Sequence, residues 1–452
     1  MTVYINHGLH LKTSDMKFYD RKTEIDILHD NERKSCEHAS FMVMMGRRRI
    51  GKTTLLTHAF KGMSYAYLFV SRDSEAMLCR KFQNSLEEQI GLHIYGTVTR
   101  FRDLFEMIMQ ESQKRHFTLI IDEFQELFRI NASTFSDIQD IWDRYHETSK
   151  INLIDCGSIH SLMKRIFEDR SEPLYGRPTS KMTIHPFTTT VLKQILYDAN
   201  PNYTPDDLLC LYMLTGGVAK YIELLIDGGY TTKEKMLDAV CRQDSYFLSE
   251  GRDLLVNEFL GEYGNYFSIL QLIASGLTRR SEIDGALQKD SGTFLKKLYE
   301  DYEMISKLQP LLAKNGSKTS KYEIHDHFLR FWFRFVYPYQ SLVERNQLDM
   351  LRKYIGEQYT QFSGRSLERY FQDKLFETGR YTDIGNWWDR SGKNEIDIVA
   401  INAFDHSGLI AEVKRNPDRI NMHSLHEKAE ALPKMPFAHY QFDFQSLSLS
   451  DM

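Results

Sequence analysis

The first third of the chain predicts an α/β fold in which helices cover both faces of a parallel sheet. Three observations support this prediction. Short apolar runs alternate with helical stretches, a glycine-rich turn directly follows the first run, and a later run ends in two carboxylates. Strands buried on both faces read as continuous apolar runs, and helices between them connect a parallel sheet. We expect strands at Phe41–Met45, Tyr65–Val70, Thr118–Ile121 and Ile151–Asp155, and helices at Thr53–Phe60, Ala76–Ile90 and Phe101–Gln113.

Composition limits the class of protein. A length of 452 residues suggests two to four domains. The net charge of -5 gives no sign that the whole molecule binds nucleic acid, but it leaves room for a local basic patch. The 5 cysteines are scattered without a C-x-x-C pair, so we expect neither a disulfide framework nor a zinc site. The sequence starts without a signal-peptide layout and contains no apolar run of about 20 residues, so we expect a cytoplasmic protein with no membrane partner.

The glycine-rich turn has the pattern of a phosphate-binding loop. Residues 46–53 read G-R-R-R-I-G-K-T, which satisfies G-x-x-x-x-G-K-[ST] without a mismatch. Glycines let the backbone approach phosphate, and the amides that begin the next helix point at the anion. Lys52 would reach the β- and γ-phosphates, and the Thr53 hydroxyl would ligate Mg²⁺. The predicted nucleotide contacts are Gly46, Arg47, Arg48, Arg49, Ile50, Gly51, Lys52, Thr53 and Thr54.

The run Thr118–Phe124 supplies the other half of this site. It reads T-L-I-I-D-E-F, a buried strand that ends in two acids. Asp122 would lie near the metal, and Glu123 would polarise the attacking water. Taken alone, the pair fits an ordinary strand end with solvated acids. Together with the loop, it predicts phosphoryl chemistry, with ATP and Mg²⁺ as cofactors and ATP hydrolysis as the activity, in which Lys52 and Glu123 are catalytic.

Two further residues are weaker candidates for contact with the nucleotide. Ser158 follows a predicted strand at the position of a γ-phosphate sensor, although a turn serine would read the same way. Arg177, in P-L-Y-G-R, would reach phosphate in its own site or in the site of a neighbouring copy, which would require a homo-oligomer. An ordinary surface arginine is the alternative.

The middle of the chain has a different sequence pattern. Helical spacing predicts an all-helical lid, with helices at Val191–Asp198, Pro205–Leu214, Val218–Leu225 and Thr232–Ser249. Three helices then precede a β-hairpin, at Tyr266–Ala274, Arg280–Leu287, Gly292–Asp301, Ile305–Leu308 and Tyr322–Ile324. This order is typical of a winged helix-turn-helix. The hairpin loop carries Lys314, Lys318 and Lys321, which predict contacts with DNA phosphates. The alternative is a winged helix that only packs against the lid.

The last part of the chain reads as α+β and carries a second set of acids. Glu368 lies on a predicted helix, Ser366–Thr378, and Asp397 lies on a strand, Glu395–Ile401. After a turn, Glu412 and Lys414 are two residues apart in Leu409–Lys414, so they share one strand face. The alternative is a solvated strand face with an exposed ion pair.

At this point the chain resembles the archaeal-type ATPases of the STAND/AAA-like group, many of which carry a C-terminal domain related to restriction endonucleases. The matching segments are F-Y-D-R-K-T-E-I-D-I-L at Phe18–Leu28, G-R-R-R-I-G-K-T-T-L at Gly46–Leu55, L-I-I-D-E-F-Q at Leu119–Gln125, P-L-Y-G-R at Pro173–Arg177, T-G-G-V-A-K-Y at Thr215–Tyr221, F-L-R-F-W-F-R-F-V at Phe328–Val336, and E-I-D-I-V-A with A-E-V-K near the end. One departure is Ala219, where the family usually has proline. Lys220 would then be a lid-borne cation for the nucleotide.

The resemblance implies an α/β P-loop NTPase fold (a parallel, AAA-like sheet) with a helical lid, a winged-helix domain and an α+β restriction-endonuclease-like C-terminal domain. The expected ranges are 15–185, 186–262, 263–345 and 355–452. It also implies that Phe18–Leu28 lies near the adenine. The set of Glu368, Asp397, Glu412 and Lys414 resembles the restriction-endonuclease pattern, in which acids hold Mg²⁺ and the lysine steadies the attacking water or the developing charge. The expected metal ligands are Thr53, Asp122, Glu368, Asp397 and Glu412, and Glu412 and Lys414 are expected to be catalytic.

Two functions of different class follow. One is a nucleotide-driven switch that gates a metal-dependent nuclease on DNA. The other is a signalling or scaffolding ATPase whose nuclease-like domain binds without cutting, because such folds also serve as binding domains. A slow ATPase that mainly holds nucleotide is a simpler third possibility.

Overall fold

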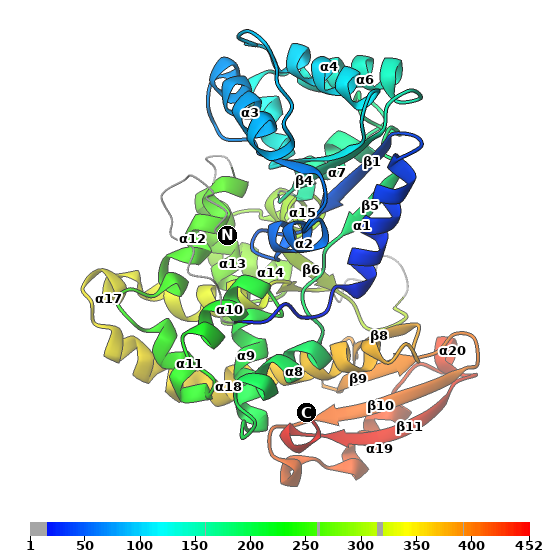
Figure 1. Cartoon of the computed structure of the whole chain (residues 1–452). Helices are drawn as coiled ribbons and strands as arrows, with labels where there is room; N and C mark the ends of the chain where they lie inside the picture. The colour runs from blue at the N-terminus through cyan, green and yellow to red at the C-terminus, as the bar shows by residue number, and fades with distance from the viewer. Residues whose placement is uncertain (1–15, 159, 260–262, 314–319, 392) are drawn as a thin grey trace. The chain divides into compact units, whose positions relative to one another are not determined.

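The computed structural model describes residues 16–158, 160–259, 263–313, 320–391 and 393–452. The chain forms two compact units. The N-terminal unit is Asp20–Pro186, and the C-terminal unit is Phe187–Met452 together with the segment that ends at Tyr19. Figure 1 shows the helices and strands of both units. The four domain ranges expected from the sequence divide the chain more finely and stay a prediction.

A parallel sheet forms the centre of the N-terminal unit. Its strands are β1 (Ser40–Met45), β2 (Tyr65–Phe69), β3 (Phe117–Asp122), β4 (Ile151–Gly157) and β5 (Ser180–Thr183). Among the described residues the order is β2-β3-β4-β1-β5, and every neighbouring pair is parallel. The predicted strands are therefore confirmed. The edge strand β5 is an addition, since its short and polar sequence gave no strand signal.

Helices pack on this sheet through apolar faces. They are α1 (Lys22–Ser35), α2 (Lys52–Ala59), α3 (Glu75–Ile90), α4 (Phe101–Ser112), α5 (Leu127–Ile130), α6 (Thr134–Tyr145) and α7 (His160–Glu168). In α4, for example, Phe101, Leu104, Phe105 and Ile108 are buried. This spacing of three and four residues puts them on one side of the helix, so the helix is stabilised mainly by packing on the sheet.

The carboxyl ends of the parallel strands meet at one edge of the sheet. Met45, at the end of β1, is level with Gly157 at the end of β4, and Phe69, at the end of β2, is level with Asp122 at the end of β3. The segments that follow these strands therefore lie close together. This edge is where open α/β sheets bind ligands.

The C-terminal unit begins with helices α8 (Thr189–Ala199), α9 (Pro205–Thr215), α10 (Ala219–Asp227), α11 (Lys233–Val240) and α12 (Tyr246–Glu258). The single helix predicted over Thr232–Ser249 is wrong, because the structure breaks it after Val240. Cys241 leaves helical geometry at φ -94° and ψ 28°, and Ser245 is extended. Helical spacing on both sides of a short polar break is easily read as one helix.

Three helices and a hairpin come next, in the predicted order. They are α13 (Tyr263–Ser275), α14 (Arg280–Leu287), α15 (Gly292–Glu300), β6 (Ile305–Leu308) and β7 (Lys321–Ile324). The strands β6 and β7 pair antiparallel. The hairpin lysines Lys314 and Lys318 lie outside the described residues. The assignment of this module as a winged helix stays a prediction.

An aromatic segment and a long helix lead to the last sheet. The segment comprises α16 (His327–Phe331), a π-helical turn (Trp332–Val336), a 3₁₀ turn (Tyr337–Tyr339) and α17 (Gln340–Glu344). The helix α18 covers Leu348–Glu377, so it begins well before the Ser366–Thr378 helix that we expected. It packs on α9 and also on the strands of the last sheet.

The last sheet is mixed. Its strands are β8 (Asp383–Trp388), β9 (Glu395–Ile401), β10 (Ser407–Val413) and β11 (Gln441–Leu447), with helices α19 (Met422–Glu430) and α20 (Lys434–Phe437). The order is β11-β10-β9-β8, in which β11 is parallel to β10 and the other pairs are antiparallel. The predicted turn between β9 and β10 is confirmed. In the described part of the chain, no helix is both long and apolar enough to cross a bilayer.

Candidate functional site

The phosphate loop joins β1 to α2 in the N-terminal unit. Its two glycines are required by geometry. A Cβ on Gly46 would lie 3.1 Å from the Ile184 carbonyl oxygen, so the loop and the chain beside it could not approach so closely. Gly51 has φ +97°, in the left-handed region that favours glycine, directly before the first residue of α2. Both glycines are therefore needed to start α2 with its amides turned toward the loop.

Lys52 lies at the centre of this loop. Its side chain is buried, and its ammonium donates to the carbonyl oxygens of Gly46 at 2.6 Å and Arg47 at 3.2 Å. Burial lowers the pKa of Lys52, while the charges of Asp122 and Glu123 oppose that shift. The ammonium is thus held inside the curve of the loop, where it could bond to phosphate oxygens.

Asp122 ends β3 beside the start of α2. The Thr53 hydroxyl donates to Asp122 Oδ2 at 3.2 Å, and the backbone N–H of Glu123 donates to Oδ1 at 2.9 Å. A hydroxyl and a carboxylate side by side are the oxygen ligands that Mg²⁺ prefers, so Thr53 and Asp122 fit the metal that the sequence implies. Their roles as ligands stay a prediction.

Sequence reasoning missed Tyr67 at this site. Its hydroxyl also donates to Asp122 Oδ2, from the neighbouring strand β2. Burial raises the pKa of Tyr67, and Asp122 adds to the shift, so this phenol stays protonated. One sequence signal was available. A tyrosine within an apolar strand places its hydroxyl in the core, and a buried hydroxyl usually has a hydrogen-bond partner.

Glu123 is held by a small hydrogen-bond network. Its backbone has φ +55°, which turns the side chain away from the strand direction. Ser158 donates to both carboxylate oxygens, at 2.8 and 2.9 Å, and the Gln125 amide donates at 2.5 Å. Arg48 in turn donates to the Ser158 hydroxyl at 3.4 Å. The structure therefore brings Ser158 to Glu123, and the predicted contact of Ser158 with phosphate stays a prediction.

The C-terminal unit brings the second set of residues together. The Lys414 ammonium lies 2.9 Å from Asp397 Oδ2 and 3.3 Å from Glu412 Oε1. The backbone N–H of Val413 donates to Asp397 Oδ2 at 2.8 Å, and Lys428 of α19 lies 3.4 Å from Glu412 Oε2. Since β9 and β10 are antiparallel neighbours, residues far from their shared turn still meet across the pair. We call Asp397, Glu412 and Lys414 the acid–lysine cluster.

Glu368 borders this cluster from α18. Burial raises its pKa to about 7, and the charge of Asp397 adds to the shift, while Arg365 and Lys414 oppose it. Among the described residues, Glu368, Asp397 and Glu412 do not bring three ligand oxygens within 4.8 Å of one another. Asp397 and Glu412 supply oxygen ligands suited to Mg²⁺ or Mn²⁺. Each is already paired with an ammonium group, which a metal would have to replace.

Comparison with known proteins gives the family. Residues 18–225 match a family described as an ATPase domain predominantly from Archaea, and residues 332–425 match one described as archaeal and bacterial proteins of unknown function. An uncharacterized protein of Methanocaldococcus jannaschii is 30% identical over 409 residues, which cover 88% of this chain and 87% of that protein. The chain belongs to this archaeal ATPase family. It is therefore a P-loop enzyme that binds and hydrolyses ATP.

One of the similar solved structures shares the fold of this archaeal ATPase. The Walker-type ATPase of Pyrococcus abyssi superposes with a TM-score of 0.54 at 17% identity, over 70% of this chain and 96% of that chain. The ORC2 protein of Aeropyrum pernix, in ADPNP–ADP complexes, gives a TM-score of 0.46 at 14% identity, over 75% of this chain and 95% of that chain. The first superposition shows that the fold is shared.

Two predicted cations of the archaeal ATPase have acidic partners within the protein. Arg177 pairs with Asp143 at 3.0 Å. The nearby Thr179 bonds to Phe41, at the amino end of β1, whereas the phosphate loop follows the other end of that strand. Arg177 therefore does not reach its own loop, and a contact with a neighbouring copy stays a prediction. Lys220 pairs with Glu223 at 2.6 Å, so its predicted role at the nucleotide also stays untested.

The hairpin of the archaeal ATPase packs on its last sheet. Lys321 pairs with Glu395 at 3.0 Å, and its ammonium lies 4.5 Å from the centre of the Trp388 ring. The backbone N–H of Leu311 donates to the Asn386 carbonyl at 3.0 Å. Lys321 was expected to contact DNA phosphate; the structure gives it a partner within the protein, and the DNA contact stays a prediction.

The end of β10 is tied to helix α9. Arg415 directly follows Lys414, and its guanidinium donates to Asp206 at 2.7 Å and to Ser363 of α18 at 2.8 Å. Lys233 of α11 also pairs with Asp206, at 3.2 Å. Sequence reasoning missed this connection, because nothing local marks a contact across more than 200 residues.

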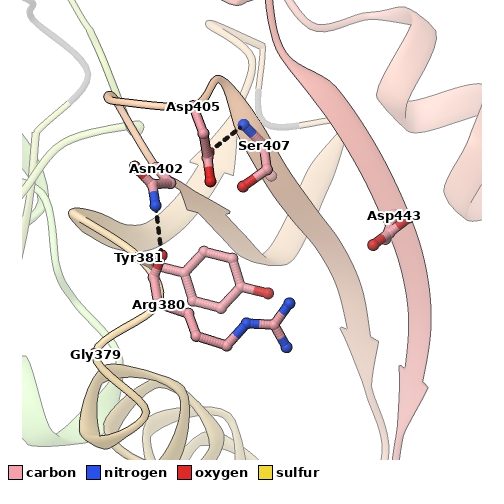
Figure 2. Close-up of a pocket in the computed structure, with 8 residues that line it drawn as sticks. Gly379, Arg380, Tyr381, Asn402, Asp405, Ser407 and Asp443 are labelled. Carbon is pink, nitrogen blue, oxygen red and sulfur yellow. Dashed lines mark hydrogen bonds between the residues drawn. The ribbon is translucent and has the colours of Figure 1, made fainter.

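A small polar hollow lies at the other end of the same sheet (Figure 2). The chain after α18, the β9–β10 turn and β11 surround it. Asn402 donates to the Arg380 carbonyl at 2.9 Å, and the backbone N–H of Ser407 donates to Asp405 at 2.9 Å. These bonds satisfy the turn itself, and the hollow is separate from the acid–lysine cluster along the strands.

Proposed function

We propose that this archaeal ATPase is a nucleotide-controlled switch whose acid–lysine cluster is a metal-dependent nuclease-like site that acts on DNA. One observation carries the proposal: the Lys414 ammonium lies within 3.3 Å of both Asp397 and Glu412, in a chain that also carries a phosphate loop. Acids that hold a divalent ion beside a lysine are suited to phosphodiester hydrolysis. The proposed setting is the cytoplasm.

The residues of the cluster have separate roles in this proposal. Asp397 and Glu412 would hold Mg²⁺ or Mn²⁺, with Glu368 nearby. The metal would polarise a phosphate oxygen and lower the pKa of a bound water. Lys414 would then bond to the water or to the charge that develops on phosphate. Lys428 and the Val413 amide keep the carboxylates in place. At the phosphate loop, Thr53 and Asp122 would hold the Mg²⁺ of ATP.

The bonds of Arg415 support a route from the lid to the cluster. Arg415 is adjacent to Lys414 in the chain and bonds to Asp206 at the start of α9. A shift of the lid helices would pull on Arg415 and move the end of β10. Glu412 lies at that strand end, and Lys414 directly follows it. Nucleotide that changes the position of the lid would therefore change the cluster.

Nicking of supercoiled plasmid tests the proposal. The full chain with Mg²⁺ or Mn²⁺ should nick the plasmid, with a rate that depends on ATP. Asp397→Asn should abolish nicking and leave ATP hydrolysis unchanged. Asp405→Asn is the matched control, because Asp405 is an exposed acid in the turn between the same two strands. Plasmid that stays intact with both metals, with and without ATP, would contradict the nuclease.

The packing of the hairpin favours a second candidate, a signalling or scaffolding ATPase that binds without cutting. The described end of the hairpin faces Glu395 and Trp388, and the carboxylates of the cluster already have lysine partners. This candidate predicts nucleotide-dependent assembly, including assembly of copies of the chain. Sizing chromatography with a slowly hydrolysed ATP analogue should show a change in mass. An unchanged mass, alone and with candidate partners, would count against it.

A further inference from the structure

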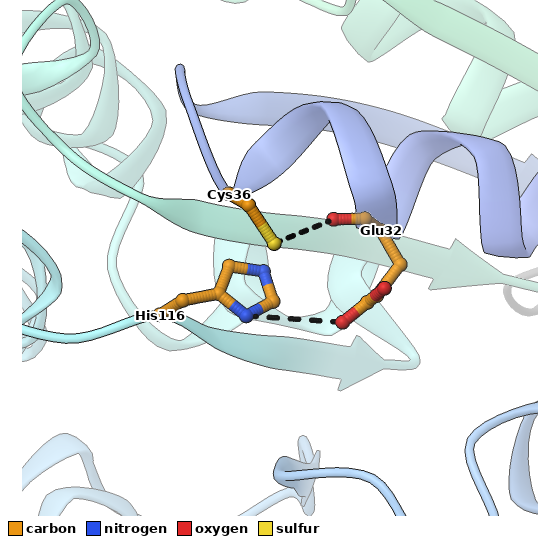
Figure 3. Close-up of side chains that lie close together, drawn as sticks. All are labelled: Glu32, Cys36 and His116. Carbon is orange, nitrogen blue, oxygen red and sulfur yellow. Dashed lines mark hydrogen bonds and ion pairs between the residues drawn. The ribbon is translucent and has the colours of Figure 1, made fainter.

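Glu32, Cys36 and His116 gather on the N-terminal unit, at the opposite end of β3 from Asp122 (Figure 3). Glu32 and Cys36 are four residues apart at the end of α1, so they share one side of the helix. His116 directly precedes β3. One ligand atom of each residue lies within 4.8 Å of the others, and this is the only such group among the residues that the structure describes. The group lies at the amino end of β3, whereas Asp122 ends that strand.

We propose that Glu32, Cys36 and His116 bind one zinc ion, with water as the fourth ligand. A carboxylate, a thiolate and an imidazole are the three ligand types that Zn²⁺ takes in proteins. In a tetrahedral site, zinc–ligand distances of about 2.0–2.3 Å separate the ligand atoms by about 3.4–3.6 Å. His116 Nδ1 lies 3.8 Å from Glu32 Oε1, so this pair needs little adjustment.

The hydrogen bonds of Ser35 decide which nitrogen of His116 faces the site. The Ser35 hydroxyl donates its one proton to the Glu32 carbonyl at 2.6 Å. It therefore accepts from Nε2 of His116, which lies 2.8 Å away. The neutral ring then carries its proton on Nε2 and its lone pair on Nδ1. Zinc-bound histidines usually have such a partner on the other nitrogen, which fixes the ring orientation.

This tautomer leaves two acceptors facing each other. The Nδ1 lone pair points toward the Glu32 carboxylate, and a contact between two acceptors is unfavourable unless a cation lies between them. Burial raises the pKa of the Cys36 thiol, the carboxylates of Glu32 and Glu37 add to the shift and Lys150 opposes it, so zinc binding would displace the thiol proton. A divalent ion bound by all three ligands would relieve the contact.

A zinc ion here would tie α1 to the start of β3. Its role would be to hold the helix on the sheet, because the ligands lie at the opposite end of β3 from Asp122. No local motif predicts zinc here, since the ligands form no C-x-x-C pair and His116 is far from Cys36 in the chain. The fold, and not a motif, brings them together.

Titration of the metal-free full chain with Co²⁺, in excess Mg²⁺, tests the site. Cobalt replaces zinc in such sites and reports a thiolate ligand by a near-ultraviolet charge-transfer band. We expect one Co²⁺ per chain with this band, and its displacement by Zn²⁺. Cys36→Ser should remove the band, and His116→Gln should weaken binding at least tenfold. Ser35→Ala should weaken it by about 10- to 100-fold while all three ligands remain.

Controls separate this site from others. Cys241→Ser removes a half-buried cysteine outside the group and should leave the band and the affinity unchanged. ATP hydrolysis by each variant shows that the N-terminal unit is folded. The proposal is overturned if the wild-type chain gives no thiolate band at 100 µM Co²⁺, or if the band persists in Cys36→Ser.

Discussion

The phosphate loop and the acid–lysine cluster are built in opposite ways. The loop is one run of eight residues, completed by the acids at the end of β3, and its shape follows from glycine geometry. The cluster joins two strands, borders α18, and is steadied by a lysine from α19. A site of the first kind can be read from a motif. A site of the second kind exists only once distant segments have packed.

The electrostatics of the two sites also differ. Lys52 bonds to neutral carbonyl oxygens, which it can exchange for phosphate oxygens at little cost. Asp397 and Glu412 are paired with ammonium groups, and a buried pair is costly to separate unless another cation replaces its partner. We therefore expect the loop to bind its ligand readily and the cluster to depend strongly on metal concentration.

The largest expected effect is at Lys52. Lys52→Ala removes the loop's only buried ammonium, and we expect ATP turnover to fall by at least about 100-fold. The cluster belongs to the other unit, so metal-dependent nicking without nucleotide should persist. Lys61→Ala, at an exposed lysine shortly after α2, is the control. Normal ATP turnover by Lys52→Ala would mean that the loop is not the hydrolytic site.

Glu123 separates binding from hydrolysis within the first site. Glu123→Gln keeps the shape of the side chain but removes the charge that would polarise water. We expect turnover to fall by about 100-fold, while nucleotide affinity changes by no more than about twofold. Fluorescent-nucleotide binding and phosphate release measure the two quantities. A parallel loss of both would assign Glu123 a structural role at the loop.

The stability of the C-terminal unit, which carries the acid–lysine cluster, should fall at acidic pH. Burial alone would raise the pKa of Glu323, but Arg369 and Arg365 outweigh it and lower the pKa to about 2, from 4.5. The ion pairs therefore stabilise the C-terminal unit above pH 4.5, and this contribution, roughly 3 kcal/mol, is lost as the pH falls toward 2. Arg365 also pairs with Glu368, which borders the acid–lysine cluster. Loss of the Glu323 ion pairs should therefore also weaken the packing around that cluster.

Denaturant unfolding of Glu323→Gln tests this dependence. The variant should be less stable at neutral pH, because two arginines lose their charged partner. Its stability should also fall less steeply between pH 4.5 and 2 than that of the wild type. Equal slopes for the two proteins would show that another carboxylate controls the acid response.

The smallest expected effect is at the hairpin. Lys321→Ala removes a partly exposed ion pair and a contact with the Trp388 ring, worth about 0.5–1 kcal/mol of stability. If the hairpin mainly packs on the last sheet, DNA affinity should change by less than about twofold while thermal stability falls slightly. A large loss of DNA affinity at unchanged stability would restore Lys321 to the DNA interface.

The sequence predicts the parts of the molecule that are local patterns and misses those that depend on how distant segments pack. The phosphate loop, the acids that end β3 and the strands β1 to β4 are local patterns, and the structure contains them where expected. Tyr67 was missed because its bond to Asp122 depends on which strand lies beside β3. The bond between Arg415 and Asp206 was missed because it depends on how α9 packs. The polar edge strand β5 pairs only because β1 presents an open side, so its own residues gave no signal.

Hydrogen exchange in the peptide 409–414 tests the central claim, that nucleotide at the loop controls the cluster. This peptide contains Val413, whose amide donates to Asp397. A slowly hydrolysed ATP analogue should change its exchange rate by at least about fivefold in the wild type. The same analogue should have no effect in Lys52→Ala. Identical exchange in the wild type with and without the analogue would contradict the claim.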